Sequence, residues 1–167
     1  MEFELCPFAD DKTRFMIKVP ITEEMRERAR QHAMQDKAIH GFYNSYSFAD
    51  DKTRYVGCLG EEVVNTYYKT RLVNKTDYDI ILNNERVEVK SQGLNASETR
   101  VKVTYEVHTL KLCDDCDKYM FVFVHNSYEY GLIVGRISKE KFNSTCRREP
   151  YKDGLEYITT ISELEEL

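Results

Sequence analysis

Two carboxylates and a lysine lie close together in the segment TDYDIILNNERVEVKSQ, at a spacing that could bind a metal ion. Asn83 and Asn84 predict a two-residue β-turn, because asparagine tolerates the left-handed backbone that tight hairpin turns require. With these two residues as the loop, Asp79 lies directly opposite Glu88 on the paired strand. The segment therefore predicts a β-hairpin that carries two opposed carboxylates.

The alternation of side chains along a strand gives this hairpin two different faces. One face is apolar and the other is charged: the first carries Tyr78, Ile80, Val87 and Val89, and the second Asp77, Asp79, Glu88 and Lys90. Opposed carboxylates, with Cβ atoms about 5 Å apart, destabilise a sheet. A divalent cation removes this repulsion, because hard cations such as Mg²⁺ bind carboxylate oxygens. The charged face therefore favours a cation site with an ammonium group beside it.

At this spacing the chain resembles the PD-(D/E)XK nuclease superfamily, which has the restriction-endonuclease-like fold. The matching residues are Asp79, the Glu88-x-Lys90 triplet, and an upstream helix that begins with the residues 57–61, GCLGE. Gln92 also resembles a variant found in parts of that superfamily. The resemblance covers roughly residues 55–137.

Two features of the chain depart from the family pattern. Tyr78 stands where the family name has proline, a position that varies within the family. Only a few residues separate the expected end of the helix near Leu72 from Asp79. The strand that the family usually has between them must therefore be very short or absent.

The resemblance implies a metal-dependent deoxyribonuclease, an endonuclease or exonuclease that hydrolyses phosphodiester bonds in DNA. Repair, recombination, restriction and viral genome processing are all compatible with this chemistry. Mg²⁺, which Mn²⁺ can replace, would be held by Asp79, Glu88 and the Val89 carbonyl, while Glu61 would help to bind a second ion or a metal-bound water. Lys90 would orient or deprotonate the attacking water, and Gln92 would position the phosphate or Lys90. Many members of the family that this chain resembles are homodimers, so the resemblance predicts a homodimer here.

Two other interpretations of the same residues stay open. The first is a catalytically silent module with the nuclease fold, which binds DNA or a protein partner. The second is a globular protein of unrelated function, in which Asp79, Glu88 and Lys90 form the solvated face of an amphipathic hairpin with a cross-strand salt bridge. Metal binding separates the nuclease from both.

The net charge of −5 argues weakly against a nucleic-acid partner, because such proteins often carry a positive excess. Local charge is more informative, since lysines and arginines cluster between residues 136 and 148 and scatter elsewhere. These side chains are candidate phosphate contacts; the alternative for each is a solvated surface. The candidates are Lys90, Arg100, Lys102, Arg136, Lys139 and Lys141.

Length and composition indicate a single ordinary domain over residues 1–167, which is 41% hydrophobic and 32% charged. No apolar run approaches the ~20 residues of a membrane helix, and the first residues do not form a secretory signal. Five cysteines without a signal favour free thiols in a reducing cytoplasm, and a virus-encoded origin is compatible with this. The lone pair Cys113 and Cys116 is expected to be a turn before a strand, because a structural zinc site usually needs two more ligands.

The order of elements predicts an α/β or α+β fold, in which helices flank a central mixed β-sheet. Residues 1–54 form an N-terminal addition to a nuclease-like core at about 55–137, and residues 138–167 a C-terminal extension. The expected helices run from Thr22 to about Asp36 and over 57–72, with short ones beginning at Ser138 and Ser162. The expected strands are 2–8, 14–19, the hairpin, regions near 100–107, 119–125 and 130–137, and the segment YITTI.

Two further expectations concern the helix over 57–72 and a repeated heptapeptide. Successive helix residues are rotated by about 100°, which places Glu61 near the edge of the apolar face and points Glu62 toward water. Gly57 and Gly60 are expected to allow close approach of the helix. The heptapeptide FADDKTR occurs twice, at 8–14 and 48–54. A shared turn between aromatic anchors is the simplest interpretation, and duplicated nucleic-acid contacts are the alternative.

Overall fold

Strand β6, Lys118–His125, shows how the protein builds two apolar layers around one sheet. Its side chains alternate between two hydrophobic clusters, because successive residues of a strand point to opposite faces. Tyr119, Phe121 and Phe123 belong to one cluster, and Met120, Val122 and Val124 to the other. A strand that is apolar on both faces must lie in the middle of the fold.

The structure is a computed structural model that describes residues 1–40, 51–70, 72–73, 78–152 and 154–167. In these residues β6 lies inside a six-stranded sheet with the order β1-β2-β7-β6-β4-β3. Strands β4 and β6 run parallel, and the other neighbours are antiparallel, so the sheet is mixed. The remaining strands are β1 Glu4–Pro7, β2 Phe15–Pro20, β3 Ile80–Leu82, β4 Glu85–Leu94 and β7 Tyr130–Ser138. The predicted N-terminal strands therefore extend the main sheet at one edge.

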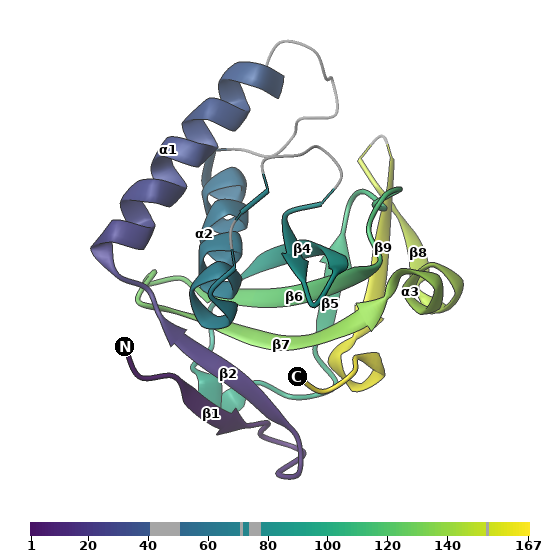
Figure 1. Ribbon diagram of the computed structural model, residues 1–167. Helices are drawn as coiled ribbons and strands as arrows, with labels where there is room; N and C mark the ends of the chain where they lie inside the picture. The colour runs from purple at the N-terminus through teal and green to yellow at the C-terminus, as the bar shows by residue number, and fades with distance from the viewer. Residues whose placement is uncertain (41–50, 71, 74–77, 153) are drawn as a thin grey trace.

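Two long helices cover one face of this sheet, α1 Glu23–His40 and α2 Asp51–Tyr68 (Figure 1). The Thr22 hydroxyl accepts a hydrogen bond from the Met25 amide at 3.2 Å, which confirms the predicted N-cap. The apolar stripe of α2 packs against Ile80, Val87 and Val89 of the hairpin. The helix layer is thus fixed directly to the strands that carry the candidate site.

A small second sheet lies on the opposite side of the main sheet, together with the short helix α3, Lys139–Thr145 (Figure 1). It has the strand order β5-β9-β8, with β5 Glu106–Thr109, β8 Arg147–Tyr151 and β9 Gly154–Thr160. Ser138 caps α3 as predicted, since its side chain accepts a hydrogen bond from the Lys141 amide. The parallel connection from β4 to β6 uses a short 3₁₀-helix, Glu98–Arg100, and β5, where an α-helix is more usual.

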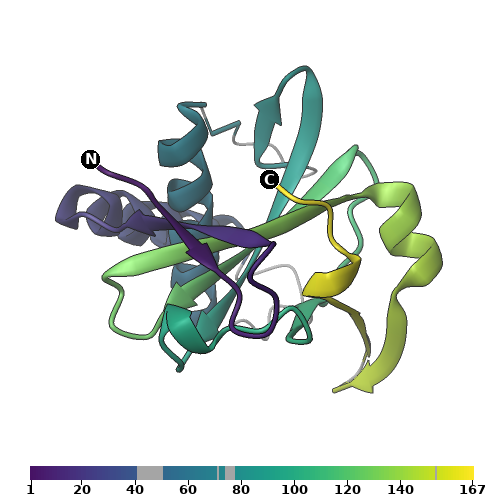
Figure 2. The same cartoon turned by 90° about the horizontal axis from the view of Figure 1, so that it is seen from below.

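The hairpin β3–β4 has the predicted turn, and it projects at one side of the molecule in Figure 2. Asn83 and Asn84 have φ angles of 51° and 65°, both left-handed as a two-residue hairpin turn demands. Ile80 pairs with Val87 and Leu82 with Glu85, as the turn requires. The paired ladder ends there, one residue short of the predicted pair Asp79–Glu88. Asp77 lies outside the described residues.

Several predicted boundaries of helices and strands were wrong. Helix α2 runs Asp51–Tyr68, so it begins six residues before and ends four residues before the expected bounds 57–72. Residues 51–54 of the second FADDKTR copy are therefore helical, whereas the first copy lies in the β1–β2 turn. Residues 48–50 lie outside the described residues. Strand β5 starts later than expected and belongs to the second sheet, and β8 was missed. Ser162 lies inside a short 3₁₀-helix, Ile161–Glu163, instead of capping a helix.

Gly60 brings α2 close to β4, as predicted, but Gly57 does not. A Cβ built at Gly60 would lie 1.7 Å from Ser91 Oγ and 2.7 Å from Ser91 Cβ, whereas at Gly57 no described atom lies within 4 Å. Gly60→Ala is therefore expected to lower the free energy of unfolding by about 1–3 kcal/mol through overpacking. Gly57→Ala should raise it by up to about 1 kcal/mol, because alanine is the better helix former.

Chemical denaturation of the two variants measures this difference within one helix. Combining Gly60→Ala with Ser91→Gly should restore part of the lost stability, since the clashing side chain is removed. Equal effects of the two alanine substitutions would show that α2 does not approach β4 as closely as the structure has it.

Candidate metal centre

Asp79 immediately precedes β3, next to the last residue pair that joins β3 to β4. Its backbone amide donates to the Val87 carbonyl at 3.0 Å, just past the last ladder pair. Its side-chain Oδ2 accepts a hydrogen bond from the Val89 amide at 2.7 Å. The carboxylate thus occupies the edge of β4 that β3 would otherwise cover, and its Oδ1 accepts no hydrogen bond from the described residues.

The Val89 carbonyl points to the same edge of β4, where β3 no longer pairs among the described residues. The amide and carbonyl of one strand residue point to the same side, which is why paired residues exchange two hydrogen bonds. Since the Val89 amide points to Asp79, its carbonyl oxygen lies on the Asp79 side as well. A carboxylate oxygen and a carbonyl oxygen are therefore available from adjacent positions, which fits the predicted ligand set.

Glu88 and Lys90 lie on the face of β4 opposite the buried Val87 and Val89. Lys90 Nζ donates to Glu88 Oε1 at 2.5 Å, and the two side chains are 21% and 16% exposed. The ammonium group therefore partly neutralises one carboxylate in a poorly solvated position. The prediction that Glu88 and Lys90 share one face of the strand is confirmed.

Glu61 reaches the same region from α2. Burial and the neighbouring carboxylates of Asp79 and Glu88 hold the pKa of Glu61 well above its usual range, and Lys90 opposes the shift. Glu61 is therefore within electrostatic reach of Asp79, Glu88 and Lys90. The close contact of Gly60 with Ser91 explains how the next residue of the helix reaches β4.

The same environment acts on Asp79. Burial first, and the charge of Glu88 second, raise the pKa of Asp79 to about 7, although its hydrogen bond from Val89 and the charge of Lys90 favour the ionised form. Three carboxylates around a single ammonium group leave excess negative charge in a partly buried site. Carboxylate and carbonyl oxygens are the donors that Mg²⁺ prefers, so the residues present fit a hard divalent cation.

Glu62 does not point to water, and that prediction was wrong. Its side chain is 5% exposed, and Arg28 of α1 donates to its Oε2 from Nε at 2.9 Å and from Nη2 at 2.8 Å. The prediction treated α2 as a helix with one buried face on the sheet. Because α1 packs on a second face of α2, a residue turned away from the sheet is still buried.

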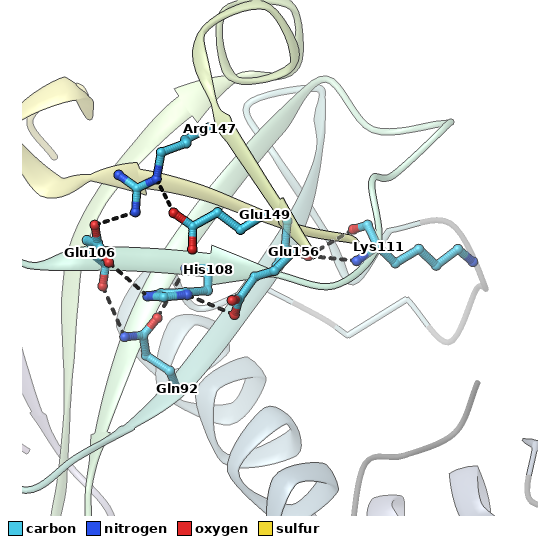
Figure 3. Close-up of polar contacts among 8 residues, drawn as sticks. Gln92, Glu106, His108, Lys111, Arg147, Glu149 and Glu156 are labelled. Carbon is cyan, nitrogen blue, oxygen red and sulfur yellow. Dashed lines mark hydrogen bonds and ion pairs between the residues drawn. The ribbon is translucent and has the colours of Figure 1, made fainter. Parts of the chain in front are cut away.

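Gln92 is held by the second sheet (Figure 3). Its side-chain amide donates to the Glu106 carbonyl at 3.1 Å and accepts from the His108 amide at 3.2 Å, and so bridges β4 to β5. Around it, His108 Nδ1 lies 2.8 Å from Glu156, and Arg147 lies 2.7 Å from Glu106. Gln92 lies on the strand of the candidate centre, but its hydrogen bonds fix the two sheets together.

The predicted phosphate contacts are dispersed. Lys139 Nζ donates to the Asp114 carbonyl and Lys141 Nζ to the Glu163 carbonyl, and Arg136 lies 3.9 Å from Glu165. These contacts hold α3 and the C-terminal segment in place. Arg100 and Lys102 are exposed, but their segment is bonded to the β1–β2 turn, at the sheet edge opposite β3. Only Lys90 therefore lies beside the candidate carboxylates.

Two neighbouring side chains were missed by the sequence analysis, His32 of α1 and Cys58 of α2. Their ligand atoms and a Glu61 carboxylate oxygen all lie within 4.8 Å of one another. Cys58 could have been found, because it precedes Glu61 by three residues and so shares a helix face with it. The position of His32 depends on how α1 packs on α2, for which the sequence has no local signal.

No protein-family model matches this sequence, and comparison with curated proteins finds no match either. In the described part of the chain, no helix has both the length and the apolar character needed to cross a membrane.

The raised pKa of Asp79 predicts a pH dependence of stability. Between the ordinary aspartate pKa of about 3.9 and about 7, the unfolded chain ionises this residue first. Its contribution to stability is therefore complete below about pH 4 and is lost as pH rises toward 7. The Asp79→Asn side chain keeps an oxygen that can accept the hydrogen bond from the Val89 amide, but the side chain cannot ionise. In EDTA, the wild-type free energy of unfolding should fall between pH 4.5 and pH 8 because Asp79 ionises in the unfolded chain first. In Asp79→Asn this fall should be smaller by about 1–3 kcal/mol.

Urea denaturation of both proteins at the two pH values measures the difference. If the Asp79→Asn variant follows the wild-type pH profile of stability, the Asp79 carboxylate is not strained by its neighbours.

Proposed function

We propose that this protein is a Mg²⁺-dependent deoxyribonuclease with a restriction-endonuclease-like core, which hydrolyses phosphodiester bonds in DNA processing. One observation carries the proposal: Lys90 pairs with Glu88 on β4, Asp79 accepts a hydrogen bond from the Val89 amide between them, and the charges of all three act on the pKa of Glu61 in α2. Strongly perturbed pKa values of buried carboxylates cluster at functional sites, which supports the proposal.

Asp79, Glu88 and the Val89 carbonyl would hold the ion, and Glu61 would assist. When bound, Mg²⁺ lowers the pKa of a water and neutralises charge that develops on the phosphate. Lys90 lies beside Glu88 and would orient the attacking water or stabilise the developing negative charge. Gln92 is held by β5 through both ends of its amide, and from this position it would orient the phosphate or Lys90.

A second function, that of a silent DNA- or protein-binding module, is favoured by a different observation. Among the predicted phosphate contacts, Lys141 and Arg136 are tied to the C-terminal segment, Lys139 is tied to the Asp114 carbonyl, and two lie at the far edge of the sheet. A nuclease usually surrounds its site with cationic groups that position the backbone. The module would keep the fold but bind no metal and cut no DNA.

Incubation with supercoiled, linear and branched DNA in Mg²⁺, Mn²⁺ or EDTA tests the proposal. We expect metal-dependent cleavage of at least one substrate and none in EDTA. Calorimetric titration with Mn²⁺ should show binding that Asp79→Asn and Glu88→Gln each weaken at least tenfold, since each removes a charged oxygen ligand. Equal Mn²⁺ affinity in all three proteins, with no cleavage, would support the silent module.

The predicted homodimer and the cytoplasmic location stay predictions. Sedimentation of the purified protein with and without DNA measures the first.

A further inference from the structure

A second group of metal-binding side chains lies between the two long helices, beside the candidate Mg²⁺ centre. It consists of His32 on α1 with Cys58 and Glu61 on α2. His32 Nδ1 is 3.3 Å from Glu61 Oε2, and all three ligand atoms lie within 4.8 Å of one another. The thiol is buried, while the imidazole and the carboxylate are 32% and 17% exposed. An ion could therefore reach this group from solvent along His32.

The donor types differ from those of the neighbouring centre. Imidazole nitrogen and thiolate sulfur suit Zn²⁺ and similar borderline ions, whereas Mg²⁺ takes oxygen ligands. Zinc binds nitrogen at about 2.0 Å and sulfur at about 2.3 Å in a tetrahedron, which places neighbouring ligand atoms about 3.5 Å apart. The His32–Glu61 separation is already close to this value, and small side-chain rotations would bring Cys58 to it.

The spacing along the helices supports the same assignment. Cys58 and Glu61 are three residues apart on α2, so they lie on one face of that helix, and His32 of α1 lies close to both. Asp36 follows His32 by four residues on α1 and pairs with Arg54 of α2 at 3.5 Å, which ties the two helices together next to the group. Two helices thus bring His32 of α1 to the i, i+3 pair Cys58 and Glu61 of α2.

We propose that His32, Cys58 and Glu61 form a three-ligand site for Zn²⁺ or a similar borderline divalent cation, with a fourth position open. The site depends only on the packing of α1 against α2, and it stands whether or not the protein cleaves DNA. Binding releases the thiol proton of Cys58, which then bonds the ion as thiolate. Because α1 and α2 each supply ligands, the ion joins the two helices.

Titration of the metal-free protein with Co²⁺ tests the site directly. Co²⁺ in a tetrahedral site with a thiolate ligand produces visible d–d bands and a sulfur-to-cobalt charge-transfer band. We expect both, with one equivalent of Co²⁺ displaced by Zn²⁺. Cys58→Ser should abolish the charge-transfer band, and His32→Ala should weaken Co²⁺ binding at least tenfold. His32 is partly exposed, so its variant is expected to fold, as circular dichroism can verify.

Two control variants identify the ligands. Cys116→Ser removes a thiol that is buried in the opposite hydrophobic cluster, and Glu88→Gln removes an oxygen ligand of the proposed Mg²⁺ centre. Both should keep the Co²⁺ spectrum of the wild type. Loss of the charge-transfer band in Cys116→Ser but not in Cys58→Ser would assign the metal to the Cys113–Cys116 pair and overturn the proposal. Unchanged Co²⁺ affinity in His32→Ala would overturn it as well.

Discussion

Lys90→Ala is expected to reduce DNA cleavage by about 10²–10⁴-fold while Mn²⁺ still binds. A positioned acid–base or electrostatic group contributes this much to catalysis. Lys90 shares a face of β4 with Glu88 and touches it at 2.5 Å, but a protonated amine has no lone pair for a metal. The substitution therefore removes catalysis and leaves the oxygen ligands. Single-turnover cleavage and Mn²⁺ titration of the same preparation separate the two properties.

Lys118 provides a matched control for this experiment. It lies at the start of β6, its side chain is 20% exposed against 21% for Lys90, and it pairs with Glu85 at 3.2 Å. Lys118→Ala thus removes an equally buried, carboxylate-paired ammonium group outside the centre, and cleavage should stay within about twofold of wild type. Cleavage at the wild-type rate by Lys90→Ala would remove the central residue from the nuclease proposal.

The hairpin was predictable because its information is local. Asn83 and Asn84 define the turn, the turn defines the register, and alternation then defines which side chains share a face. Ile80, Val87 and Val89 accordingly pack under α2. Tyr78, assigned to the same face, packs in the other cluster, because the chain leaves the ladder before it reaches that residue.

The second FADDKTR copy shows where local information ends. Seven identical residues form a turn in one context, and the last four of them form the first turn of a helix in another. Residues 51–54 are helical because the apolar positions that follow, such as Val56 and Leu59, continue the buried face of α2. Intrinsic preference is weak, and packing against the sheet decides the outcome.

The candidate centre also contains residues whose position local sequence predicts and residues whose position depends on helix packing. Asp79, Glu88 and Lys90 belong to one hairpin and could be placed together from spacing alone. His32 and Arg28 lie on α1, and their partners on α2 depend on how two helices pack, which no motif in either helix encodes. The error over Glu62 has this origin, because a helix between a sheet and another helix has two buried faces.

Glu61 is expected to control DNA cleavage, whereas Glu62 is expected to control the stability of the fold. Glu61→Gln should reduce DNA cleavage by about tenfold or more, a loss of roughly 1.4 kcal/mol of barrier lowering, because Glu61 belongs to the carboxylate group around Asp79. The same substitution should leave the metal-free protein equally or more stable at pH 8. The raised pKa of Glu61 shows that its ionised form is disfavoured in the folded state.

Glu62→Gln should instead lower the free energy of unfolding by about 1–2 kcal/mol, since it removes the charge from two hydrogen bonds with Arg28. Cleavage per folded molecule should stay near wild type, because Glu62 faces α1. Arg28→Ala leaves a buried carboxylate without its partner, so its effect on stability should equal or exceed that of Glu62→Gln. Denaturation and cleavage assays on the three variants decide the assignment. A larger loss of cleavage in Glu62→Gln than in Glu61→Gln would place Glu62, and not Glu61, in the metal centre.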